Sequence, residues 1–464
     1  MKTKLRLTFI ITLILVTVLS IASYAQFKLP QYEKIELENG LTIYLMEKHD
    51  VPLISISAVF NAGAERDGEH SGIASFTAEA LRFGTASYTK IQIDSLFNFY
   101  GSNLNTNATL DYAGLSTTIM KESANELLPI IKEFISSPTF PEEEITKRLQ
   151  RWLAELDQAK ESPRSVILSY YNKLVYGDAP YGNPVNGTKG GIEKLTTNAV
   201  EEFYNYNYSP SSSAISVVGD FDATNMKTIL SDLFDDWKGY PLTTIGDTFY
   251  NEVPFNESTV YLIDKDNATE TTFLIGGYGI TMSNEDQTQI DVINTILGGR
   301  FTSWLNDELR VNAGLTYGAR SRFRAYKQSG TFYMYSFTAT KNTEAAIDLS
   351  IKTYNRLFEK GIDEKILTSA KNYVKGQFPP DYETASALAN LLCLMYVYGL
   401  TDSYINDFEN KVDAMTVERA NQLIIKYFPK DNLQFTLVGK ADEIRDVVKK
   451  YGKVIERDIA EDGF

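Results

Sequence analysis

The residues that could carry hydrolytic chemistry are few in this chain of 464 residues. It has two histidines, His49 and His70, and one cysteine, Cys393. The histidines stand too far apart to share a helix face, so a zinc site built from histidines is excluded. We interpret both histidines as solvated turn or loop residues, and Cys393, in an apolar run typical of a helix, as a small core residue. The chain has no G-x-S-x-G and no usable Cys-His pair, so a self-sufficient hydrolase of another mechanism ranks last.

A second feature is segment 72–85, which reads G-I-A-S-F-T-A-E-A-L-R-F-G-T. Its apolar positions recur at helical spacing and predict a buried helix face made of Ile73, Phe76, Thr77, Ala80 and Leu81. The segment resembles G-I-A-H-F-L-E-H-M-L-F-x-G-T of the insulinase-like (pitrilysin, M16) metallopeptidases, in which the histidines bind zinc and the glutamate serves as general base. The resemblance implies that Ser75 and Glu79 replace the histidines and that Ala78 replaces the general base.

The third zinc ligand of that family is a glutamate on a later helix, and the resemblance carries it over to Glu155 in L-A-E-L. A further acidic position of the family helix falls on Arg148. Glu79 and Glu155 together could hold a hard cation. We favour the alternative that these carboxylates pair with Arg148 or Arg151, or are solvated. The resemblance thus implies no metal in this chain.

The stretch 296–317, I-L-G-G-R-F-T-S-W-L-N-D-E-L-R-V-N-A-G-L-T-Y, contains a second group of candidate residues. An apolar stripe predicts a helix, with Gly314 at its C-terminal cap and a strand opening at Leu315. The members of the stripe are Phe301, Trp304, Leu305 and Leu309. This stretch is similar to the M16 segment L-G-G-G-x-x-S-x-L-F-x-x-L-R-x-x-x-G-L-x-Y.

The resemblance implies that Arg310 and Tyr317 reach an active site. A tyrosine hydroxyl can donate to the oxyanion that develops on a scissile carbonyl. An arginine can hold a peptide carbonyl or carboxylate in place. Gly298 and Gly299 would let a loop approach the peptide backbone closely. The alternative is structural, with Arg310 as a helix-end cation and Tyr317 packed in a core.

Two similar halves must position these residues. T-I-Y-L-M-E-K at 42–48 has an echo in T-V-Y-L-I-D-K at 259–265, and V-V-G-D at 217–220 has one in L-V-G-K at 437–440. The nearly constant offset indicates a duplicated domain. Strands and helices are mixed without strict alternation, so we expect two similar α+β domains of the M16 peptidase type, each with a mixed or antiparallel sheet covered by helices. The predicted boundaries are 26–238 and 254–464, with a Gly/Pro-containing linker at 239–253.

The first 25 residues have a charged start, an apolar core and a small-x-small end, and predict a cleaved signal peptide. The formal net charge of −15 argues against nucleic acid and against anionic membranes as partners. No later stretch is long and apolar enough to span a bilayer. An exported chain with one cysteine suits a bacterial periplasm.

These observations, taken with the resemblance, lead to one main hypothesis. The chain is a non-catalytic, substrate-binding subunit of a secreted, heterodimeric M16 zinc endopeptidase. Its partner is an M16 homologue that carries H-x-x-E-H and the zinc, its substrates are peptides, and Arg310 and Tyr317 act in trans at the partner's zinc site. The alternative is a structural or peptide-binding homologue with no role in proteolysis, as the core proteins of respiratory complexes are thought to be.

Overall fold

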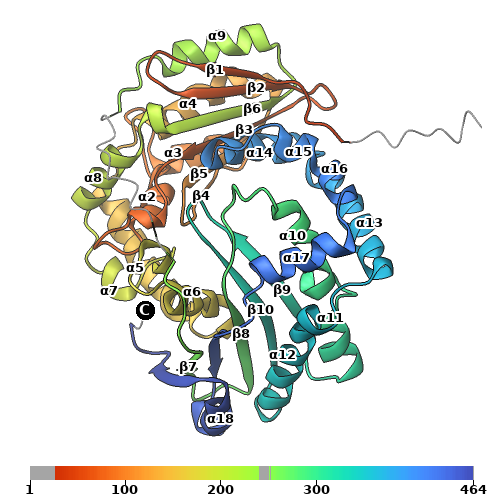
Figure 1. Cartoon of the computed structure of the whole chain (residues 1–464). Coiled ribbons are helices and arrows are strands. Elements are labelled where there is room, and N and C mark those ends of the chain that lie inside the picture. The colour runs from red at the N-terminus through yellow and green to blue at the C-terminus, as the bar shows by residue number, and fades with distance from the viewer. Residues whose placement is uncertain (1–26, 240–249, 251, 463–464) are drawn as a thin grey trace, which may run out of the picture.

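The sequence echoes occupy equivalent places in two six-stranded sheets. The strand orders are β1-β2-β6-β3-β5-β4 and β12-β7-β11-β8-β10-β9. The first echo forms β2 and β7, and the second forms β6 and β11. In each sheet the two echo strands lie side by side and run parallel. Two similar α+β domains, each with a mixed sheet, are therefore confirmed (Figure 1).

The computed structural model describes residues 27–239, 250 and 252–462. The predicted signal peptide and most of the predicted linker lie outside these residues. The strands of the N-terminal sheet are β1 (Glu33–Glu36), β2 (Thr42–Glu47), β3 (Leu53–Phe60), β4 (Asn105–Ala108), β5 (Ala113–Met120) and β6 (Ser213–Gly219). Those of the C-terminal sheet are β7 (Thr259–Asp264), β8 (Glu270–Tyr278), β9 (Ala319–Ala325), β10 (Gly330–Ala339), β11 (Gln434–Gly439) and β12 (Lys453–Asp458).

Helices surround both sheets. Those of the N-terminal half are α2 (Ile73–Ala80), α3 (Lys90–Phe99), α4 (Ala124–Ser136), α5 (Glu142–Ala159), α6 (Pro163–Tyr176), α7 (Lys189–Ile192), α8 (Thr197–Asn207) and α9 (Ala223–Phe234). Those of the C-terminal half are α10 (Gln287–Asn294), α11 (Trp304–Asn306), α12 (Thr343–Glu359), α13 (Glu364–Asp381), α14 (Ala385–Tyr398), α15 (Ser403–Asn406), α16 (Phe408–Asp413), α17 (Val417–Tyr427) and α18 (Ala441–Val448). Two π-helical turns, η5 (Thr295–Gly299) and η6 (Asp307–Asn312), flank α11. In the ranges that the structure describes, no helix has the length and hydropathy to cross a bilayer.

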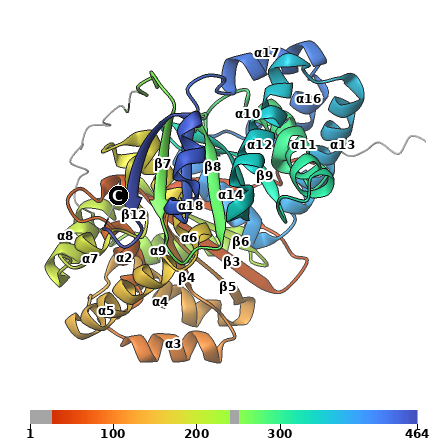
Figure 2. The same cartoon turned by 90° about the horizontal axis from the view of Figure 1, so that it is seen from below.

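Each sheet is covered on one face by a helix from the other half. Helix α6 packs on β8 and β11, while α14 packs on β3 and β6, the equivalent strands of the other sheet. Figures 1 and 2 show the remaining large helices of the C-terminal half, among them α10, α12, α13 and α17, gathered on one side of its sheet. Because each sheet is covered by a helix from the other half, neither hydrophobic core is complete without the other domain.

The ends of the described chain also cross between the halves. The Phe27 amide donates to Glu409 over 3.2 Å, and the Leu29 amide donates to Asn406 over 2.9 Å. At the other end, the carboxylate of Asp462 accepts from the amides of residues 189 and 190 at 2.9 and 2.7 Å. These contacts fasten each terminal segment to the opposite domain.

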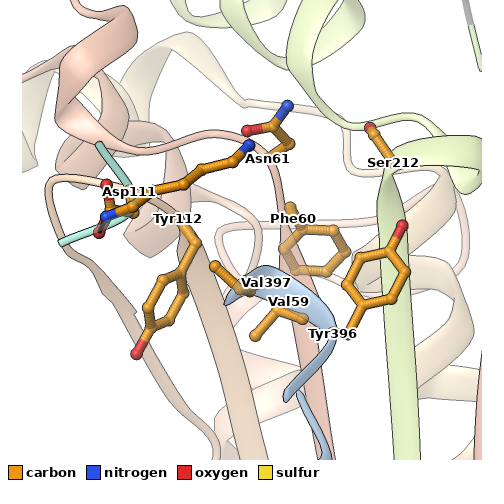
Figure 3. A pocket seen from close by; sticks show the side chains of 9 residues that line it. Val59, Phe60, Asn61, Asp111, Tyr112, Ser212, Tyr396 and Val397 are labelled. Carbon is orange, nitrogen blue, oxygen red and sulfur yellow. Dashed lines mark hydrogen bonds between the residues drawn. The ribbon is translucent and has the colours of Figure 1, made fainter. Parts of the chain in front are cut away.

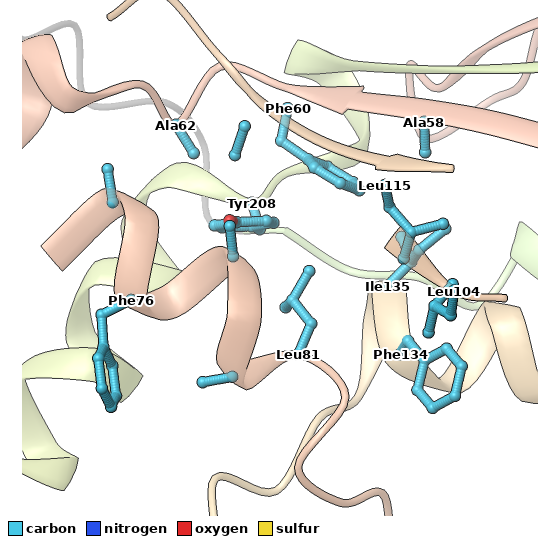
Figure 4. Close-up of a cluster of buried hydrophobic side chains, with 14 of the residues drawn as sticks. Ala58, Phe60, Ala62, Phe76, Leu81, Leu104, Leu115, Phe134, Ile135 and Tyr208 are labelled. Atoms are coloured by element: carbon cyan, nitrogen blue, oxygen red, sulfur yellow. The ribbon is translucent and has the colours of Figure 1, made fainter. Parts of the chain in front are cut away.

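The helix predicted at 72–83 lies inside the N-terminal core. Leu81 lies beside the buried group of Phe60, Phe134 and Tyr208, while Phe76 points to the other side of the helix (Figure 4), where its ring centre is 5.4 Å from that of Trp152. All five residues of the predicted apolar stripe are buried, so that prediction is confirmed. The helix itself is shorter and ends at Ala80.

Candidate functional site

Helix α2 presents almost no chemistry to solvent. Ala78 is fully buried, and Ser75 is 7% exposed, with its hydroxyl donating to the Val185 carbonyl over 2.6 Å. Asp67 accepts from two backbone N–H groups at the N-terminus of this helix. Of the three degenerate motif positions, the structure leaves only the side chain of Glu79 partly exposed. Helix α2, which carries these three positions, is therefore part of the hydrophobic core of the N-terminal domain.

Arg148 occupies the space between the two candidate carboxylates. Its Nε donates to Glu79 Oε1 over 2.7 Å, and its two terminal nitrogens donate to the oxygens of Glu155 at 3.1 and 2.9 Å. Its guanidinium carbon lies 4.5 Å from the centre of the Trp152 ring, and the indole nitrogen donates to the Asn186 carbonyl. The predicted pairing of the carboxylates with Arg148 is confirmed. Among the described residues, no group of three or more His, Cys, Asp or Glu is placed to hold a metal ion.

His49 is an exposed turn residue, as predicted, whereas His70 is only partly solvated. His49 Nδ1 lies 2.7 Å from Asp220 Oδ1, and this contact raises the pKa of the imidazole. His70 is half-buried in the turn that leads into α2, with its backbone carbonyl accepting from the Ile73 amide. Cys393 is buried on α14, as predicted, and burial raises the pKa of its thiol.

Arg310 and Tyr317 lie together on the surface of the C-terminal domain. Arg310 is exposed at the end of η6, and its guanidinium carbon lies 4.9 Å from the centre of the Phe301 ring. Tyr317 is 81% exposed. Both residues line one pocket of about 340 Å³. The alternative that Tyr317 packs in a hydrophobic core is therefore wrong.

The chain around this pair differs in part from the prediction. Gly314 has a left-handed φ of +63° and ends the helical segment as expected. The next strand, however, begins at Ala319 and not at Leu315, because the intervening residues form an extended loop. Phe301 is 65% exposed and does not belong to the apolar stripe, whereas Leu309 is fully buried. Phe301 lies in a non-helical turn before α11, so the helical spacing that predicted the stripe does not apply to it.

Gly298 and Gly299 line the same pocket, and the structure supplies a packing reason for the first of them. A Cβ on Gly298 would lie 2.1 Å from the Ser321 amide nitrogen, so the turn η5 packs directly against β9. A Cβ on Gly299 would meet Asn294 at 3.2 Å. Close approach of a substrate to either glycine stays a prediction.

The sequence argument missed the other charged residues of the pocket. Arg300, Arg320 and Arg322 also line it, as does Tyr373 from α13. A signal was present in the alternating arginines of R-S-R-F-R at 320–324, which an edge strand displays on one side.

A second cavity lies between the two halves, and the hydrogen bonds beside it hold the two domains together. Figure 3 shows Asp111 and Tyr112 on one side of it and Tyr396 and Val397 from α14 on the other. The buried carboxylate of Asp111 accepts from the hydroxyls of Tyr181 (2.8 Å) and Tyr398 (3.0 Å). Burial raises the pKa of Asp111, while these bonds lower it. With both oxygens engaged, this carboxylate joins the domains.

The two candidate sites of the chain lie apart. In both Figure 1 and Figure 2, α2 and α11 stand on opposite sides of the molecule. The structure therefore brings Glu79 together with Glu155, and Arg310 together with Tyr317, but it does not bring the two pairs together.

Comparison with known proteins gives two family matches. A family model described as insulinase (peptidase family M16) matches residues 43–189, and one described as peptidase M16 inactive domain matches residues 194–374. Together these ranges cover well over half of the chain.

Individual relatives carry different descriptions. The chain is 22% identical to an uncharacterized zinc protease, YmxG, of Bacillus subtilis, over 85% of this chain and 95% of that protein. It is 25% identical to the non-peptidase homolog YmxG of Helicobacter pylori, over 85% and 90%.

Solved structures share the fold. The peptidase M16 inactive domain from Pseudomonas fluorescens has a TM-score of 0.82 at 22% identity, covering 88% of this chain and 98% of that one. A chain of complex III2 from Candida albicans has a TM-score of 0.73 at 16% identity, covering 91% and 100%.

Proposed function

Since the chain belongs to the insulinase-like M16 peptidase family, we propose that it is the non-catalytic, substrate-binding subunit of a secreted, heterodimeric zinc endopeptidase. The partner is an M16 homologue that carries H-x-x-E-H and supplies the zinc. This chain supplies Arg310 and Tyr317 in trans. It needs no cofactor of its own, and its substrates are peptides.

The side chains at α2 support the proposal that this chain is not the catalytic subunit. A catalytic zinc needs three ligands and an open position for water. Here a guanidinium fills the space between Glu79 and Glu155, and Ala78 has no group that could take a proton from water. Restoring metal binding would require displacing a cation that the chain itself provides.

The observation that carries the proposal is the outward presentation of Tyr317, which is 81% exposed. A large aromatic side chain gains stability by burial, so one held in solvent beside a pocket is best explained by a partner or ligand. Phe301, which lines the same pocket and contacts Arg310, is 65% exposed and extends the apolar surface beside Tyr317. A second chain docked on this surface would bury these side chains and bring the pair to its own active site.

The chemistry of the pair suits peptide hydrolysis. The attack of zinc-bound water on a scissile carbonyl places negative charge on the carbonyl oxygen. The Tyr317 hydroxyl is a neutral donor that can stabilise this charge as it forms. The Arg310 guanidinium can hold a neighbouring carbonyl or carboxylate through two parallel hydrogen bonds.

Relatives of both kinds are consistent with a division of labour, because a zinc protease and a non-peptidase homolog match this chain over most of their length. The likeness to a chain of complex III2 favours the second candidate, a structural homologue. The exposed arginine–tyrosine pair favours the first, because a purely structural role leaves it unexplained.

The test is reconstitution. The mature chain and an H-x-x-E-H homologue from the same genome are purified separately and together, and zinc content and cleavage of a peptide library are measured on each sample. We expect activity only in the mixture, with zinc bound to the homologue. A homologue whose motif glutamate is changed to glutamine serves as the inactive control. An isolated chain that holds stoichiometric zinc and cuts peptides would refute the proposal, and a mixture no more active than the homologue alone would favour the structural role.

A further inference from the structure

The pocket of Arg310 and Tyr317 is basic, although the whole chain has a net charge of −15. Four arginines line it, namely Arg300, Arg310, Arg320 and Arg322. Among the described residues that line the pocket there is no aspartate or glutamate. Such a local excess of positive charge on an acidic protein focuses the field on the pocket and attracts anions.

None of the four arginines forms an ion pair within the part of the chain that the structure describes. Arg300 donates to the Ser369 hydroxyl over 3.0 Å, while its Nε is buried without a partner. Two acidic side chains close to the pocket are already engaged. Glu270, in the adjoining hollow, pairs with Arg164 at 3.5 Å, and Glu308, on η6, pairs with Arg356 at 3.2 Å. The guanidinium donors of the pocket are thus available to a ligand.

The spacing of the arginines suits an extended peptide. Arg320 and Arg322 alternate along β9 with buried Ala319 and Ser321, so both point to the same side. Alternate side chains of a strand are about 7 Å apart, in the protein and in an extended ligand alike. Two acidic residues separated by one residue would therefore face the two arginines.

The ligand must be held by side chains, because the backbone edge of β9 is partly occupied. Asn294 donates from Nδ2 to the Ser321 carbonyl over 3.2 Å, and Asn306 accepts from the Ala319 amide at 3.4 Å. An added strand cannot use these groups. Recognition therefore depends on the guanidinium groups, which bind carboxylates through two parallel hydrogen bonds.

We propose that this pocket binds carboxylates of an extended peptide, so that the subunit selects acidic substrate segments. The inference rests on the proposed function for its biological meaning, and the binding itself can be measured without any catalysis. The four unpaired arginines carry it. A competing occupant is an acidic surface of the partner subunit, and the experiment separates the two.

The experiment measures peptide binding to the isolated mature chain by fluorescence anisotropy. Two labelled ten-residue peptides with blocked ends are identical except that one has aspartate and the other asparagine at alternate positions. A third peptide is neutral in its side chains and has a free C-terminal carboxylate. We expect the aspartate peptide to bind at least about 10-fold tighter than the asparagine peptide in low salt. Raising the salt to 0.5 M should remove most of the difference.

The matched variants are two double substitutions on opposite edges of the same sheet. Arg320→Gln/Arg322→Gln on β9 should abolish the preference for aspartate. Lys453→Gln/Arg457→Gln on β12 removes the same charge from exposed positions and should leave the preference intact. Thermal melts of both variants check that they fold.

Each outcome decides the inference. Equal binding of the aspartate and asparagine peptides, or an unchanged preference in the β9 variant, overturns it. Preference for the free-terminus peptide alone assigns the pocket to a terminal carboxylate and overturns the selection of acidic segments. The β9 variant could keep the wild-type preference for the aspartate peptide and yet lose association with the zinc-bearing homologue. In that case the arginines form a subunit interface and the inference is overturned. Selective binding by a chain that never forms an active complex would refute only the proposed function.

Discussion

The Nε of Arg148 donates to Oε1 of Glu79 across 2.7 Å, at a position that the family resemblance assigns to a degenerate zinc motif. The same guanidinium holds both oxygens of Glu155 and covers the face of Trp152. A cation from the chain itself thus satisfies two carboxylates that would otherwise repel each other. This explains how Glu79 and Glu155 can both be held beside the same side chain.

Restoring the motif residues should not restore zinc binding while Arg148 is present. We expect the triple variant Ser75→His/Ala78→Glu/Glu79→His to bind little zinc, because the guanidinium still pairs with Glu155 and repels a divalent cation. Adding Arg148→Ala should bring the content close to one zinc per chain. The measurement is zinc by atomic emission after dialysis.

The control for this experiment is Arg151→Ala in the triple variant. Arg151 lies on the same helix and is exposed, so its removal changes the net charge equally without opening the site. Stoichiometric zinc in the triple variant with Arg148 intact would contradict the prediction. So would the failure of the quadruple variant to bind zinc while it remains folded.

Glu79→Gln should destabilise the protein moderately. The side chain of Arg148 is 11% exposed, and the substitution leaves its Nε without a charged acceptor. We expect a loss of about 1–2 kcal/mol in the free energy of unfolding, measured by urea denaturation. Glu143→Gln on α5 is the control, because this exposed pair with Lys147 should contribute nothing measurable. Equal urea midpoints for Glu79→Gln and Glu143→Gln would show that Glu155 alone is a sufficient charged partner for Arg148.

Tyr317→Phe should affect turnover but not stability. The hydroxyl is exposed, so the melting temperature of the isolated chain should not change. In the reconstituted complex we expect kcat to fall by about 10²–10³-fold, which is the effect of losing one oxyanion donor. Tyr206→Phe, at an exposed position on α8, is the control for phenol removal. Unchanged kcat in the Tyr317 variant would remove this residue from the mechanism.

Much of the architecture could be predicted from local patterns. The repeated strand sequences predicted the duplication, because β2 and β7 are both buried along most of their length in equivalent places of the two sheets. The helix at α2 followed from its apolar spacing. The exchange of α6 and α14 between the domains could not be predicted, because it depends on which sheet face is left uncovered after each half has folded.

The candidate site was predicted in part. The pairing of Glu79 and Glu155 with Arg148 followed from the residue types at matching positions. The exposure of Phe301 did not, because this residue lies in a turn before α11, where helical spacing does not apply. The basic pocket was missed because it joins residues of η5, η6, β9 and α13, which only the tertiary structure brings together.

Asp67 should make stability fall as the pH rises from about 4 to 7. Burial raises the pKa of this carboxyl from 3.8 to about 7, while the N–H bonds from Gly72 and Ala74 lower it. Between these two values the folded chain binds a proton that the unfolded chain has lost, so the free energy of unfolding decreases with pH. The contribution is complete below pH 3.8 and is lost above about pH 7.

The test is Asp67→Asn, which cannot ionise but keeps an acceptor oxygen for only one of the two N–H donors. Between pH 5 and pH 8, the free energy of unfolding of wild type should fall with pH relative to that of the variant in urea denaturation. Asp178→Asn is the control, because Lys173 lowers the pKa of Asp178 and the carboxyl stays ionised in both states over this range. Parallel pH profiles for wild type and Asp67→Asn would refute the assignment.

Two buried tyrosines offer a matched test of how the domains are joined. Tyr171, on α6, donates to the Phe332 carbonyl of β10 over 2.7 Å and thereby links the halves. Tyr208 is as deeply buried, but its hydroxyl has no hydrogen-bond partner among the described residues. Tyr171→Phe should therefore cost about 1–2 kcal/mol, whereas Tyr208→Phe should be neutral or stabilising, because it removes an unsatisfied polar group. Because α6 belongs to one half and packs on the sheet of the other, the Tyr171 variant should shift a single unfolding transition of the whole chain. A separate early transition of one domain, seen by calorimetry, would show that the exchanged helices do not couple the halves.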